Sequence, residues 1–457
     1  MFYGRKEELK LINDKILSEK FEFGILYGRR RVGKTTILKE VIRNNEGIYF
    51  VANEMDFEHN IKNFGNIVAK YFNMDVNFGS LDQIFNFIKN ASQNKRFVVV
   101  IDEFTYLFSK EKGVISLVQN LVDSLQDSNL VLILAGSQVR MIEEIISYQK
   151  PLYGRATFKL HIKPFNYLES QLFYPNFSNE DKVIAYSVFG GIPFYLSLID
   201  DKLSIKENII NLLLKETSLL KNEVEFVLKQ ELTNTQTYRM VLNAIASGAT
   251  KVNEISNKAR INNTGNTSTY LKTLESLGII KRVIPFGENI NSRKSLYKIS
   301  DQMFNFYYTF INKNLSALTF LNENQFYENY ISPELVRYAS FSFEEICRSF
   351  LAIINKEKKT DFYTEINSYW GNNILIKEEV ELDIVARRGE DIDVYECKFT
   401  NKEFNYEQLE TLKRNASFLN PSKYGVFSKS GASNNVINEL DYIYTLNDLY
   451  QIELIVL

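Results

Sequence analysis

The stretch FGILYGRRRVGKTT, residues 23–36, decides how the first part of this chain is expected to fold. Its apolar beginning predicts a buried strand, and the apolar spacing that follows it predicts a helix. Between the two lies the pattern Gly-x-x-x-x-Gly-Lys-Thr, a Walker A motif in its usual strand-to-helix context. The glycines let backbone N–H groups wrap around phosphates beside the positive end of the helix. A chance glycine-rich turn would not also supply the strand, the Lys-Thr pair and the helix, so we expect a phosphate-binding loop.

Individual loop residues have separate expected roles. Lys34 is expected to reach the β- and γ-phosphates of a nucleotide, and the Thr35 hydroxyl is expected to ligate Mg²⁺. The arginines in the variable positions either add charge to the phosphate site or are solvated, and both interpretations stay open. The residues expected to bind the nucleotide are Gly28, Arg29, Arg30, Arg31, Val32, Gly33, Lys34, Thr35 and Thr36.

A second apolar run, FVVVIDEF at residues 97–104, ends in two acidic residues. Such a run predicts a buried parallel strand, and ligands gather at the carboxyl ends of these strands. Asp102 is expected to hold Mg²⁺ through water, and Glu103 to polarise the water that attacks the nucleotide. An acidic pair that caps a helix is the other interpretation. The phosphate-binding loop upstream favours catalysis.

Two further segments supply candidates near the phosphates. LVLILAGSQ, residues 130–138, predicts another buried strand, whose end would place Ser137 or Gln138 beside the γ-phosphate. A simple turn at the strand end is the alternative. In PLYGRA, residues 151–156, Arg155 follows a glycine in a loop. It is either an arginine finger, which stabilises charge in the transition state, or a surface arginine.

These segments together resemble the archaeal-type ATPase family, which is related to the AAA and STAND classes of P-loop NTPases. The matching pieces are FYGRKEEL at 2–9, GRRRVGKTT, VVVIDEF, LILAGSQ, PLYGRA and GGIPFYL at 190–196. The resemblance implies ATP rather than GTP, with residues 2–5 near the adenine. It also implies that Arg155 acts on the site of a neighbouring subunit, in a homo-oligomer. No clear sensor arginine follows GGIPFYL, which departs from the pattern.

The composition is that of an ordinary globular protein of 457 residues, 45% hydrophobic and 24% charged. A net charge of −2 means that binding to nucleic acid would need a local basic patch. Two cysteines and two histidines are too few for a disulfide framework or a zinc site, which favours a reducing cytosol. A charged start and the lack of a ~18-residue apolar run predict a cytoplasmic protein without signal peptide or membrane partner.

The chain is long enough for several domains. Short apolar strands alternate with helical stretches in the first part, which predicts an α/β fold of the P-loop NTPase type, with a parallel sheet and helices on both faces. The strands are expected at 23–27, 48–51, 97–101 and 130–135. The expected parts are an ATPase domain at 1–200, a helical lid or connector at 201–235, a winged-helix domain at 236–300, a helical linker at 301–339 and a second αβ domain at 340–457.

The winged-helix expectation rests on residues 237–300. The segment NNTGNTSTYLKTLESLGIIKRV starts polar and ends apolar, as a recognition helix does. The following segment, 281–298, holds five Lys or Arg residues and one Glu, which suits a β-wing that contacts phosphates. A winged helix used for packing or as an ATPase lid is equally open. No arginine stands at the exposed start of the helix, so base-specific reading is not expected.

The stretch VELDIVARRGEDIDVYECKF, residues 380–399, predicts two strands joined by a charged turn. Because strand side chains alternate, Asp383 lies on one face of the first strand, and Glu396 and Lys398 share a face of the second. A hairpin would bring Asp383 and Glu396 together as ligands of Mg²⁺, while Lys398 positions a water against a phosphodiester. A solvated face of an edge strand is the alternative.

This stretch resembles the PD-(D/E)xK nuclease superfamily, and the nuclease-like C-terminal domain often attached to archaeal-type ATPases. The upstream helix SFEEICRSFL, residues 342–351, would supply Glu344 or Glu345. EQLETLKRNA, residues 407–416, resembles the helix that follows the core of such nucleases, whereas Leu382 stands where the name of the motif has Pro. The resemblance implies a restriction-endonuclease-like αβ domain.

The expectations combine into an ATP-hydrolysing P-loop enzyme coupled to a Mg²⁺-dependent, nuclease-like domain directed at DNA. One alternative is a STAND-like, ATP-driven switch whose winged-helix and C-terminal domains only bind nucleic acid or a partner protein. Another is a DNA-binding regulator that uses the winged helix. The first predicts Mg²⁺-dependent cutting and the second ATPase activity without cutting. The third predicts duplex binding that falls steeply with salt.

Overall fold

The computed structural model describes residues 2–93, 95–108, 113–148, 150–357 and 362–451. They form two compact units, which are described separately here. The N-terminal unit holds the chain up to residue 164 together with 192–194, and the C-terminal unit holds 165–191 and the chain from 195 onward. The five-part division expected from the sequence is finer than these two units, and its boundaries stay predictions.

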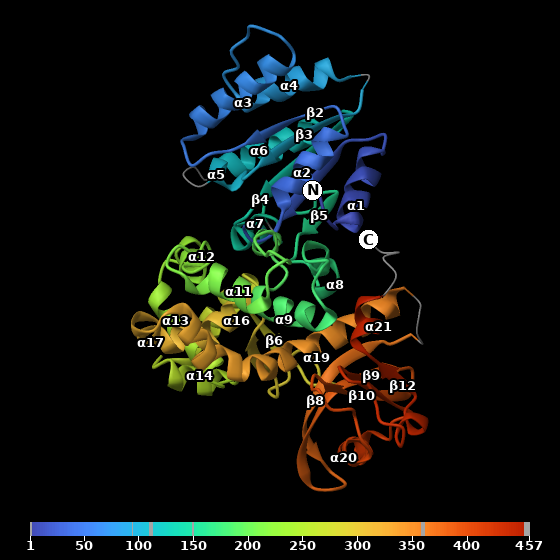
Figure 1. Cartoon of the computed structure of the whole chain (residues 1–457). Helices are drawn as coiled ribbons and strands as arrows, with labels where there is room; N and C mark the ends of the chain where they lie inside the picture. The colour runs from blue at the N-terminus through green and yellow to red at the C-terminus, as the bar shows by residue number, and fades with distance from the viewer. Residues whose placement is uncertain (1, 94, 109–112, 149, 358–361, 452–457) are drawn as a thin grey trace. The chain divides into compact units, whose positions relative to one another are not determined.

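The N-terminal unit is built on a five-stranded sheet in which all neighbours are parallel, in the order β2-β3-β4-β1-β5 (Figure 1). Its strands are β1 (Glu22–Tyr27), β2 (Gly47–Val51), β3 (Phe97–Asp102), β4 (Leu130–Gly136) and β5 (Phe158–His161). The predicted parallel α/β sheet is confirmed, with strands at all four expected places. β5 was not predicted from the sequence, and it is a four-residue edge strand with one buried position.

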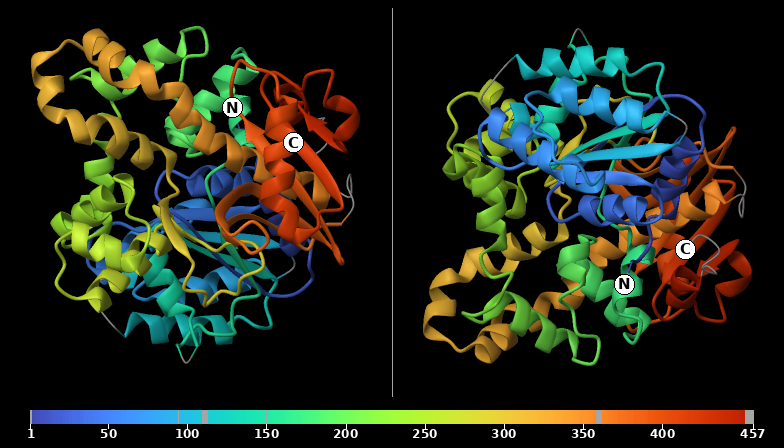
Figure 2. Two further views of the ribbon diagram at one scale, coloured as in Figure 1. Left: turned by 90° about the horizontal axis from the view of Figure 1, so that it is seen from below. Right: turned by 90° about the horizontal axis from the view of Figure 1, so that it is seen from above.

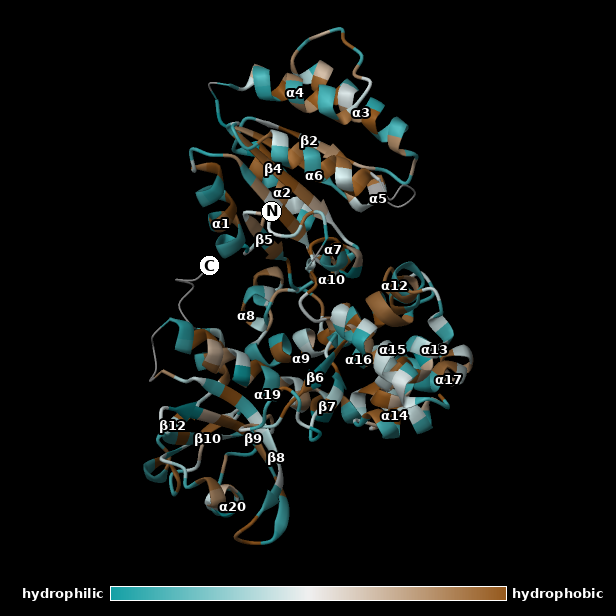
Figure 3. Cartoon of the chain, turned by 180° about the vertical axis from the view of Figure 1, so that it is seen from behind, coloured by the Kyte–Doolittle hydropathy of each residue, from teal (hydrophilic) through white to brown (hydrophobic). Residues whose placement is uncertain are grey.

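Helices cover both faces of this sheet. α1 (Lys6–Ile16) and α2 (Lys34–Arg43) bury their apolar residues against one face. The other face is covered by α3 (Phe57–Tyr71), α4 (Leu81–Ala91), α5 (Thr105–Phe108), α6 (Val114–Ser124) and α7 (Val139–Ile145). In Figure 3 the strands are largely brown, while the helices carry teal on their outer sides. Strands buried on both faces read as continuous apolar runs, which is why the sequence pattern located them.

The C-terminal unit begins with helices. They are α8 (Tyr167–Ser170), α9 (Asn179–Phe189), α10 (Pro193–Leu196), which begins in the N-terminal unit, α11 (Ile205–Ile209) and α12 (Glu223–Glu231). Three helices and a hairpin follow: α13 (Thr235–Ala246), α14 (Val252–Lys258), α15 (Thr264–Ser276), and the antiparallel strands β6 (Ile280–Val283) and β7 (Leu296–Ile299). Three short helices, α16 (Gln302–Phe306), α17 (Leu315–Phe320) and α18 (Glu323–Phe326), precede the long α19 (Ser332–Lys356).

A mixed, five-stranded sheet completes this unit, in the order β12-β11-β10-β9-β8. Its elements are β8 (Glu365–Asn373), β9 (Glu378–Arg388), β10 (Asp391–Lys398), α20 (Tyr406–Ala416), β11 (Lys423–Ser428), β12 (Tyr442–Tyr444) and α21 (Leu446–Tyr450). β8, β9 and β10 are antiparallel neighbours, whereas β11 pairs in parallel with β10 and β12. The strands are orange to red in Figure 2. The αβ character expected here, and the β9–β10 hairpin, are confirmed.

In the part of the chain that the structure describes, every helix is too short or too polar to cross a bilayer.

Candidate functional site

The phosphate-binding loop joins β1 to α2, and its two glycines are required by geometry. A Cβ atom at Gly28 would lie 2.3 Å from the carbonyl oxygen of Ile162, so no larger residue fits there. Gly33 precedes α2 with a φ of +93°, a left-handed conformation that glycine adopts freely. The Lys34 ammonium donates hydrogen bonds to the carbonyl oxygens of Gly28 at 2.8 Å and Arg29 at 3.0 Å. The lysine therefore folds back over the loop that is expected to wrap the phosphates.

The loop arginines have protein partners. Arg30 donates to the Tyr106 hydroxyl at 3.1 Å, and the Arg31 guanidinium lies 4.4 Å from the centre of the Phe194 ring. Such cation–π contacts stabilise the charge without removing it. The sequence left open whether these arginines bind phosphate or are solvated. The structure adds a third role, because Arg30 and Arg31 hold the loop against neighbouring aromatic residues.

Two other predicted loop residues differ in exposure. Val32 is fully buried in the core beneath α2, so its side chain is directed away from solvent. Thr36, in the first turn of α2, is exposed. Val32 can therefore serve a nucleotide only through its backbone.

Arg5 supports the loop from the other side, and sequence reasoning did not assign it this role. Its side chain is 5% exposed and donates to the backbone carbonyls of Val32 at 2.9 Å and Lys163 at 2.7 Å. It also pairs with Glu8 at 2.9 Å. Arg5 thereby links the start of α1, the phosphate-binding loop and the segment after β5. The sequence shows that Arg5 is a basic residue in FYGRKEEL, but only the fold shows which carbonyl oxygens it contacts.

Thr35 and Asp102 meet at the carboxyl end of β3. The Thr35 hydroxyl donates to Asp102 Oδ2 at 2.8 Å, and the Glu103 N–H donates to Asp102 Oδ1 at 2.9 Å. Tyr49, which the sequence analysis missed, donates to Asp102 Oδ2 at 2.6 Å. Burial and the Asp102 carboxylate raise the pKa of Tyr49, so its hydroxyl stays protonated. A hydroxyl beside a carboxylate supplies the oxygen donors that Mg²⁺ prefers, so these residues fit that ion.

Glu103 is held in an unusual conformation. Its φ is +52°, in the left-handed region that costs a non-glycine residue energy and is often found at functional sites. Its Oε2 accepts hydrogen bonds from the Ser137 hydroxyl at 2.8 Å and the Ser137 N–H at 3.3 Å. The strands β3 and β4, which carry these residues at their ends, are neighbours in the sheet. Of the two candidates at the end of β4, Ser137 is therefore the one that contacts Glu103, while Gln138 precedes α7.

Arg155 is engaged within its own chain. Its Nε and Nη2 atoms bind the two Asp123 carboxylate oxygens at 2.8 and 2.9 Å, and Nη1 donates to the Pro151 carbonyl at 2.8 Å. The hydrogen bond from Arg155 lowers the pKa of Asp123. Exposed ion pairs contribute at most about 1 kcal/mol, so this contact is weak enough to be exchanged for a phosphate.

In the C-terminal unit, the β9–β10 hairpin gathers the residues expected from VELDIVARRGEDIDVYECKF. The register pairs Tyr395 with Ile384, which are the chain neighbours of Glu396 and Asp383. The Cys397 N–H donates to Asp383 Oδ2 at 2.8 Å, and the Lys398 ammonium pairs with Glu396.

The charged groups of the hairpin act on one another's pKa. Burial, followed by the charges of Glu396 and Glu344, raises the pKa of Asp383 to about 8. Burial alone would lower the pKa of Lys398, but Glu396 raises it. The three charged residues predicted on the hairpin therefore lie together.

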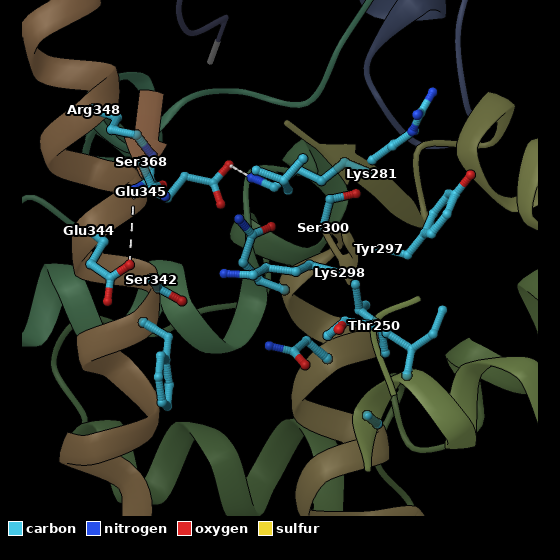
Figure 4. Close-up of a pocket in the computed structure, with 18 of the residues that line it drawn as sticks. Thr250, Lys281, Tyr297, Lys298, Ser300, Ser342, Glu344, Glu345, Arg348 and Ser368 are labelled. Carbon is cyan, nitrogen blue, oxygen red and sulfur yellow. Dashed lines mark hydrogen bonds and ion pairs between the residues drawn. The ribbon is translucent and has the colours of Figure 1, made fainter. Parts of the chain in front are cut away.

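The structure also separates Glu344 from Glu345 on α19. Glu344 contributes to the raised pKa of Asp383, and burial raises its own pKa. Glu345 instead pairs with Lys281 of β6 at 2.6 Å (Figure 4). Arg348, one turn along α19, donates to the backbone carbonyl of Asp383 at 3.1 Å. Glu344 thus belongs to the carboxylate cluster, which we define as Glu344, Asp383 and Glu396. Glu345 instead faces the β6–β7 hairpin.

The carboxylate cluster has the donors for a divalent cation, but not a ready coordination geometry. Like charges that share a site raise one another's pKa, and a bound cation would relieve that repulsion. Oxygen-rich groups of this kind suit Mg²⁺. Within the described ranges, however, no three His, Cys, Asp or Glu side chains converge closely enough to hold a metal.

The fold and the loop define a P-loop ATPase, and comparison with known proteins gives the family. Residues 2–199 match a family model described as "ATPase domain predominantly from Archaea", and residues 307–411 match one described as "Archaea bacterial proteins of unknown function". An uncharacterized protein of Methanocaldococcus jannaschii is 34% identical over 396 residues, 86% of this chain and 85% of that protein. The chain belongs to this archaeal ATPase family, and its C-terminal region is the domain of unknown function.

Two further similarities are to proteins whose names refer to ATP or to an ATPase. A short protein of M. jannaschii, named as an uncharacterized ATP-binding protein, is 48% identical over 46 residues, 10% of this chain and 78% of its own length. The solved structure of the Walker-type ATPase PABY2304 of Pyrococcus abyssi superimposes with a TM-score of 0.51 and 21% identity. The match covers 67% of this chain and 96% of that one, and it shows a shared fold.

Proposed function

We propose that the N-terminal unit binds ATP with Mg²⁺ and hydrolyses it. The observation that carries this proposal is the 2.8 Å hydrogen bond between Thr35 and Asp102, made at the strand end beside the phosphate-binding loop. Lys34 would bind the β- and γ-phosphates, while Thr35 and Asp102 would hold the cation. Mg²⁺, when bound, offsets the negative charge that the phosphates carry. Membership of an ATPase family, and a relative named as ATP-binding, support the choice of nucleotide.

The remaining residues of this unit are assigned to the hydrolytic step. Glu103 accepts a proton from the attacking water, and Ser137 holds its carboxylate in place. Arg155 acts in trans, leaving Asp123 to reach the phosphates bound by a neighbouring subunit of a homo-oligomer. The bidentate geometry with Asp123 supports this role, because the same fork of donors matches two phosphate oxygens.

We propose further that the C-terminal unit carries a Mg²⁺-dependent nuclease of the PD-(D/E)xK type that acts on DNA. The carrying observation is the carboxylate cluster with Lys398 beside it. Asp383 and Glu396 would hold the cation, and Glu344 would join them as a ligand only after the cluster rearranges. Lys398 would orient a water toward the phosphodiester. The order of α19, three antiparallel strands, α20 and a parallel strand also supports a nuclease-like domain.

The helices α13, α14 and α15 and the β6–β7 hairpin are assigned to a winged helix. Their order along the chain supports this, because a helical triplet is followed directly by a two-stranded wing. The basic residues of the hairpin supply charge for contacts with DNA phosphates. No base-specific contact is assigned to it.

A second candidate function is a switch, in which ATP rearranges the chain and the C-terminal domain binds nucleic acid or a partner protein without cutting it. Two observations favour it. Burial and the charges of Glu396 and Glu344 raise the pKa of Asp383, which favours its uncharged form over the carboxylate that a metal ligand requires. The described residues also form no three-ligand metal group. Binding of substrate or cation would have to reorganise the cluster before it could cut.

One experiment separates the two candidates. Wild type, Lys34→Ala and Lys398→Ala are incubated with single- and double-stranded DNA and RNA, with and without ATP and Mg²⁺. Cutting that requires Mg²⁺ and is lost in Lys398→Ala supports the nuclease. ATP hydrolysis by wild type and Lys398→Ala, with no polymer cut, supports the switch. A wild type that hydrolyses no ATP contradicts the proposed ATPase.

A further inference from the structure

A cavity of about 840 Å³ lies in the C-terminal unit, between the β6–β7 hairpin, α19 and β8 (Figure 4). The end of α13 and part of α16 complete its wall. Its size is typical of pockets that enclose a small organic ligand. A few nucleotides of one strand fit such a volume, whereas a duplex does not.

The charged residues around the cavity are mostly basic. Lys281, Arg282, Lys298 and Arg348 line it, against the acidic Glu344 and Glu345. Figure 4 shows Lys281 and Lys298 extending from the hairpin toward the side of α19 that carries the two glutamates. The lining also includes hydroxyl groups, which hydrogen-bond to phosphate and sugar oxygens: Thr250, Tyr297, Ser300, Ser342 and Ser368.

Two aromatic residues add a surface on which bases stack. Tyr297 of β7 and Phe341 of α19 both line the cavity, and Phe341 is 62% exposed. Tyr297 is partly buried. A basic groove combined with aromatic side chains is the arrangement by which proteins bind single strands without reading sequence. These two side chains favour a strand over inorganic phosphate, which needs no stacking surface.

The cavity is continuous with the carboxylate cluster. Glu344 belongs to both, and Arg348, which also lines the cavity, donates to the backbone carbonyl of Asp383 at 3.1 Å. The positive charges of Arg348 and Lys298 act to lower the pKa of Glu344 against the effect of burial, so Lys298 lies close to that carboxyl. A ligand held by these basic residues would present its backbone to the cluster.

We propose that this cavity binds the sugar–phosphate backbone of a single nucleic-acid strand and delivers it to the carboxylate cluster. Lys281, Lys298 and Arg348 contact phosphates on either side of the one that faces Glu344. The β6–β7 hairpin therefore forms one wall of the binding site of the C-terminal domain. This inference rests on the proposed nuclease function for what happens to the strand, but not for the binding itself.

The ion pair between Lys281 and Glu345 is the contact that a strand must replace. The two side chains are 36% and 42% exposed, and ion pairs with this exposure contribute little to stability. A phosphate that enters the cavity therefore competes for Lys281 at little cost. Removing the Glu345 charge would remove this competition.

The test measures binding apart from cutting. Fluorescence anisotropy follows a labelled, short single-stranded DNA added to the full chain without Mg²⁺, over a series of salt concentrations. Each of Lys281→Gln and Lys298→Gln is expected to weaken binding about fivefold at 0.1 M salt and to reduce the salt slope by about 0.7. Glu345→Gln is expected to tighten the binding of the single strand. The control Lys229→Gln changes an exposed lysine of α12, outside the cavity, and is expected to bind as wild type does.

Three results would overturn the inference: no binding of the single strand by wild type, an unchanged slope in the double variant of Lys281 and Lys298, or an equal loss in Lys229→Gln. Lys298 is exposed, so its replacement tests the site even if Lys281→Gln disturbs the fold. Strand binding that depends on the two lysines, without any cutting in Mg²⁺, contradicts only the nuclease. Cutting that is unchanged in the variants of Lys281 and Lys298 contradicts only the proposed strand binding in the cavity.

Discussion

The Ser137 hydroxyl donates a 2.8 Å hydrogen bond to Glu103, and so joins the ends of two adjacent strands at the proposed site of ATP hydrolysis. Glu103 adopts its left-handed conformation, at a φ of +52°, next to Asp102 in the chain. This conformation lets consecutive carboxylates serve different partners, because Asp102 accepts from Thr35 while Glu103 accepts from Ser137. The neighbouring acidic residues of the IDEF segment thereby acquire separate tasks.

Replacing Glu103 tests its assignment directly. Glu103→Gln keeps the size of the side chain but removes the base, so ATP should still bind while turnover falls about 10²-fold or more. Phosphate release and titration with a fluorescent nucleotide measure the two effects separately. Normal hydrolysis by this variant would show that another group polarises the water.

Ser137→Ala should have a milder effect in the same direction. Without the hydroxyl, the Glu103 carboxylate loses its 2.8 Å hydrogen bond but keeps its charge. We expect kcat to fall about tenfold while the affinity for ATP is unchanged, since the loss corresponds to about 1.4 kcal/mol. Ser137→Thr, which retains a hydroxyl, is the matched control. A fall in affinity with normal kcat would instead place Ser137 against the nucleotide.

Tyr49→Phe should raise the Mg²⁺ concentration needed for ATPase activity. The variant loses only the hydroxyl that donates to Asp102 at 2.6 Å, and such supporting partners commonly alter metal affinity about tenfold or more. Half-maximal activity in a Mg²⁺ titration is the measurement, and Lys34→Ala, which should not bind nucleotide at all, sets the baseline. An unchanged Mg²⁺ requirement would mean that Asp102 does not hold the ion.

The action of Arg155 in trans can be tested by mixing inactive proteins. Arg155→Ala keeps an intact nucleotide site, whereas Lys34→Ala keeps an intact arginine. If the finger reaches a neighbouring subunit, each variant alone should be inactive and their mixture should regain part of the ATPase activity. Asp123→Asn, which only breaks the ion pair, should remain active. Normal ATP hydrolysis by Arg155→Ala alone would show that Arg155 is not an arginine finger.

The carboxylate cluster should make stability depend on pH. The pKa of Asp383 is about 8 in the folded chain, against 3.8 for an ordinary Asp, because of burial and the charges of Glu396 and Glu344. The folded state therefore binds the proton more tightly, and stability is lost as the pH rises from about 4 to about 8. Asp383→Asn removes this loss, so its advantage in Tm over wild type should grow between pH 5 and pH 8.

Thermal unfolding across that pH range measures the effect, at about 2–4 °C for each kcal/mol in a unit of this size. Glu390→Gln, in the exposed turn of the same hairpin, is the control and should leave the pH dependence unchanged. A Tm difference between Asp383→Asn and wild type that does not change with pH would contradict the raised pKa. Added Mg²⁺ should stabilise wild type at pH 8 but not Asp383→Asn.

The sequence predicted those features that depend on neighbouring residues in the chain. The strands β1, β3 and β4 are continuous apolar runs, and the loop between residues 28 and 35 has a fixed spacing, so both were visible locally. The Arg5 and Tyr49 contacts join residues far apart in sequence, and no spacing rule signals them. The strand β5 was missed because an edge strand of four residues shows too little periodicity.

The second site shows a different limit. Glu344 and Glu345 are adjacent on a helix. The sequence pattern of a consecutive pair does not tell which of the two faces the β9–β10 hairpin. The structure decides it, because the phase of α19 directs Glu344 to Asp383 and Glu345 to Lys281. Lys281 was grouped with a basic wing from composition, and its position across from α19 became visible only when the elements were assembled.

The attachment of Arg5 has a practical consequence for producing the protein. Because this side chain donates hydrogen bonds to the carbonyl oxygens of Val32 and Lys163, Arg5 braces the phosphate-binding loop. A fusion placed directly next to Arg5, or a truncation that removes it, would disturb that brace without changing the loop itself. Purification handles should therefore be separated from this region by a flexible spacer that can be cleaved off.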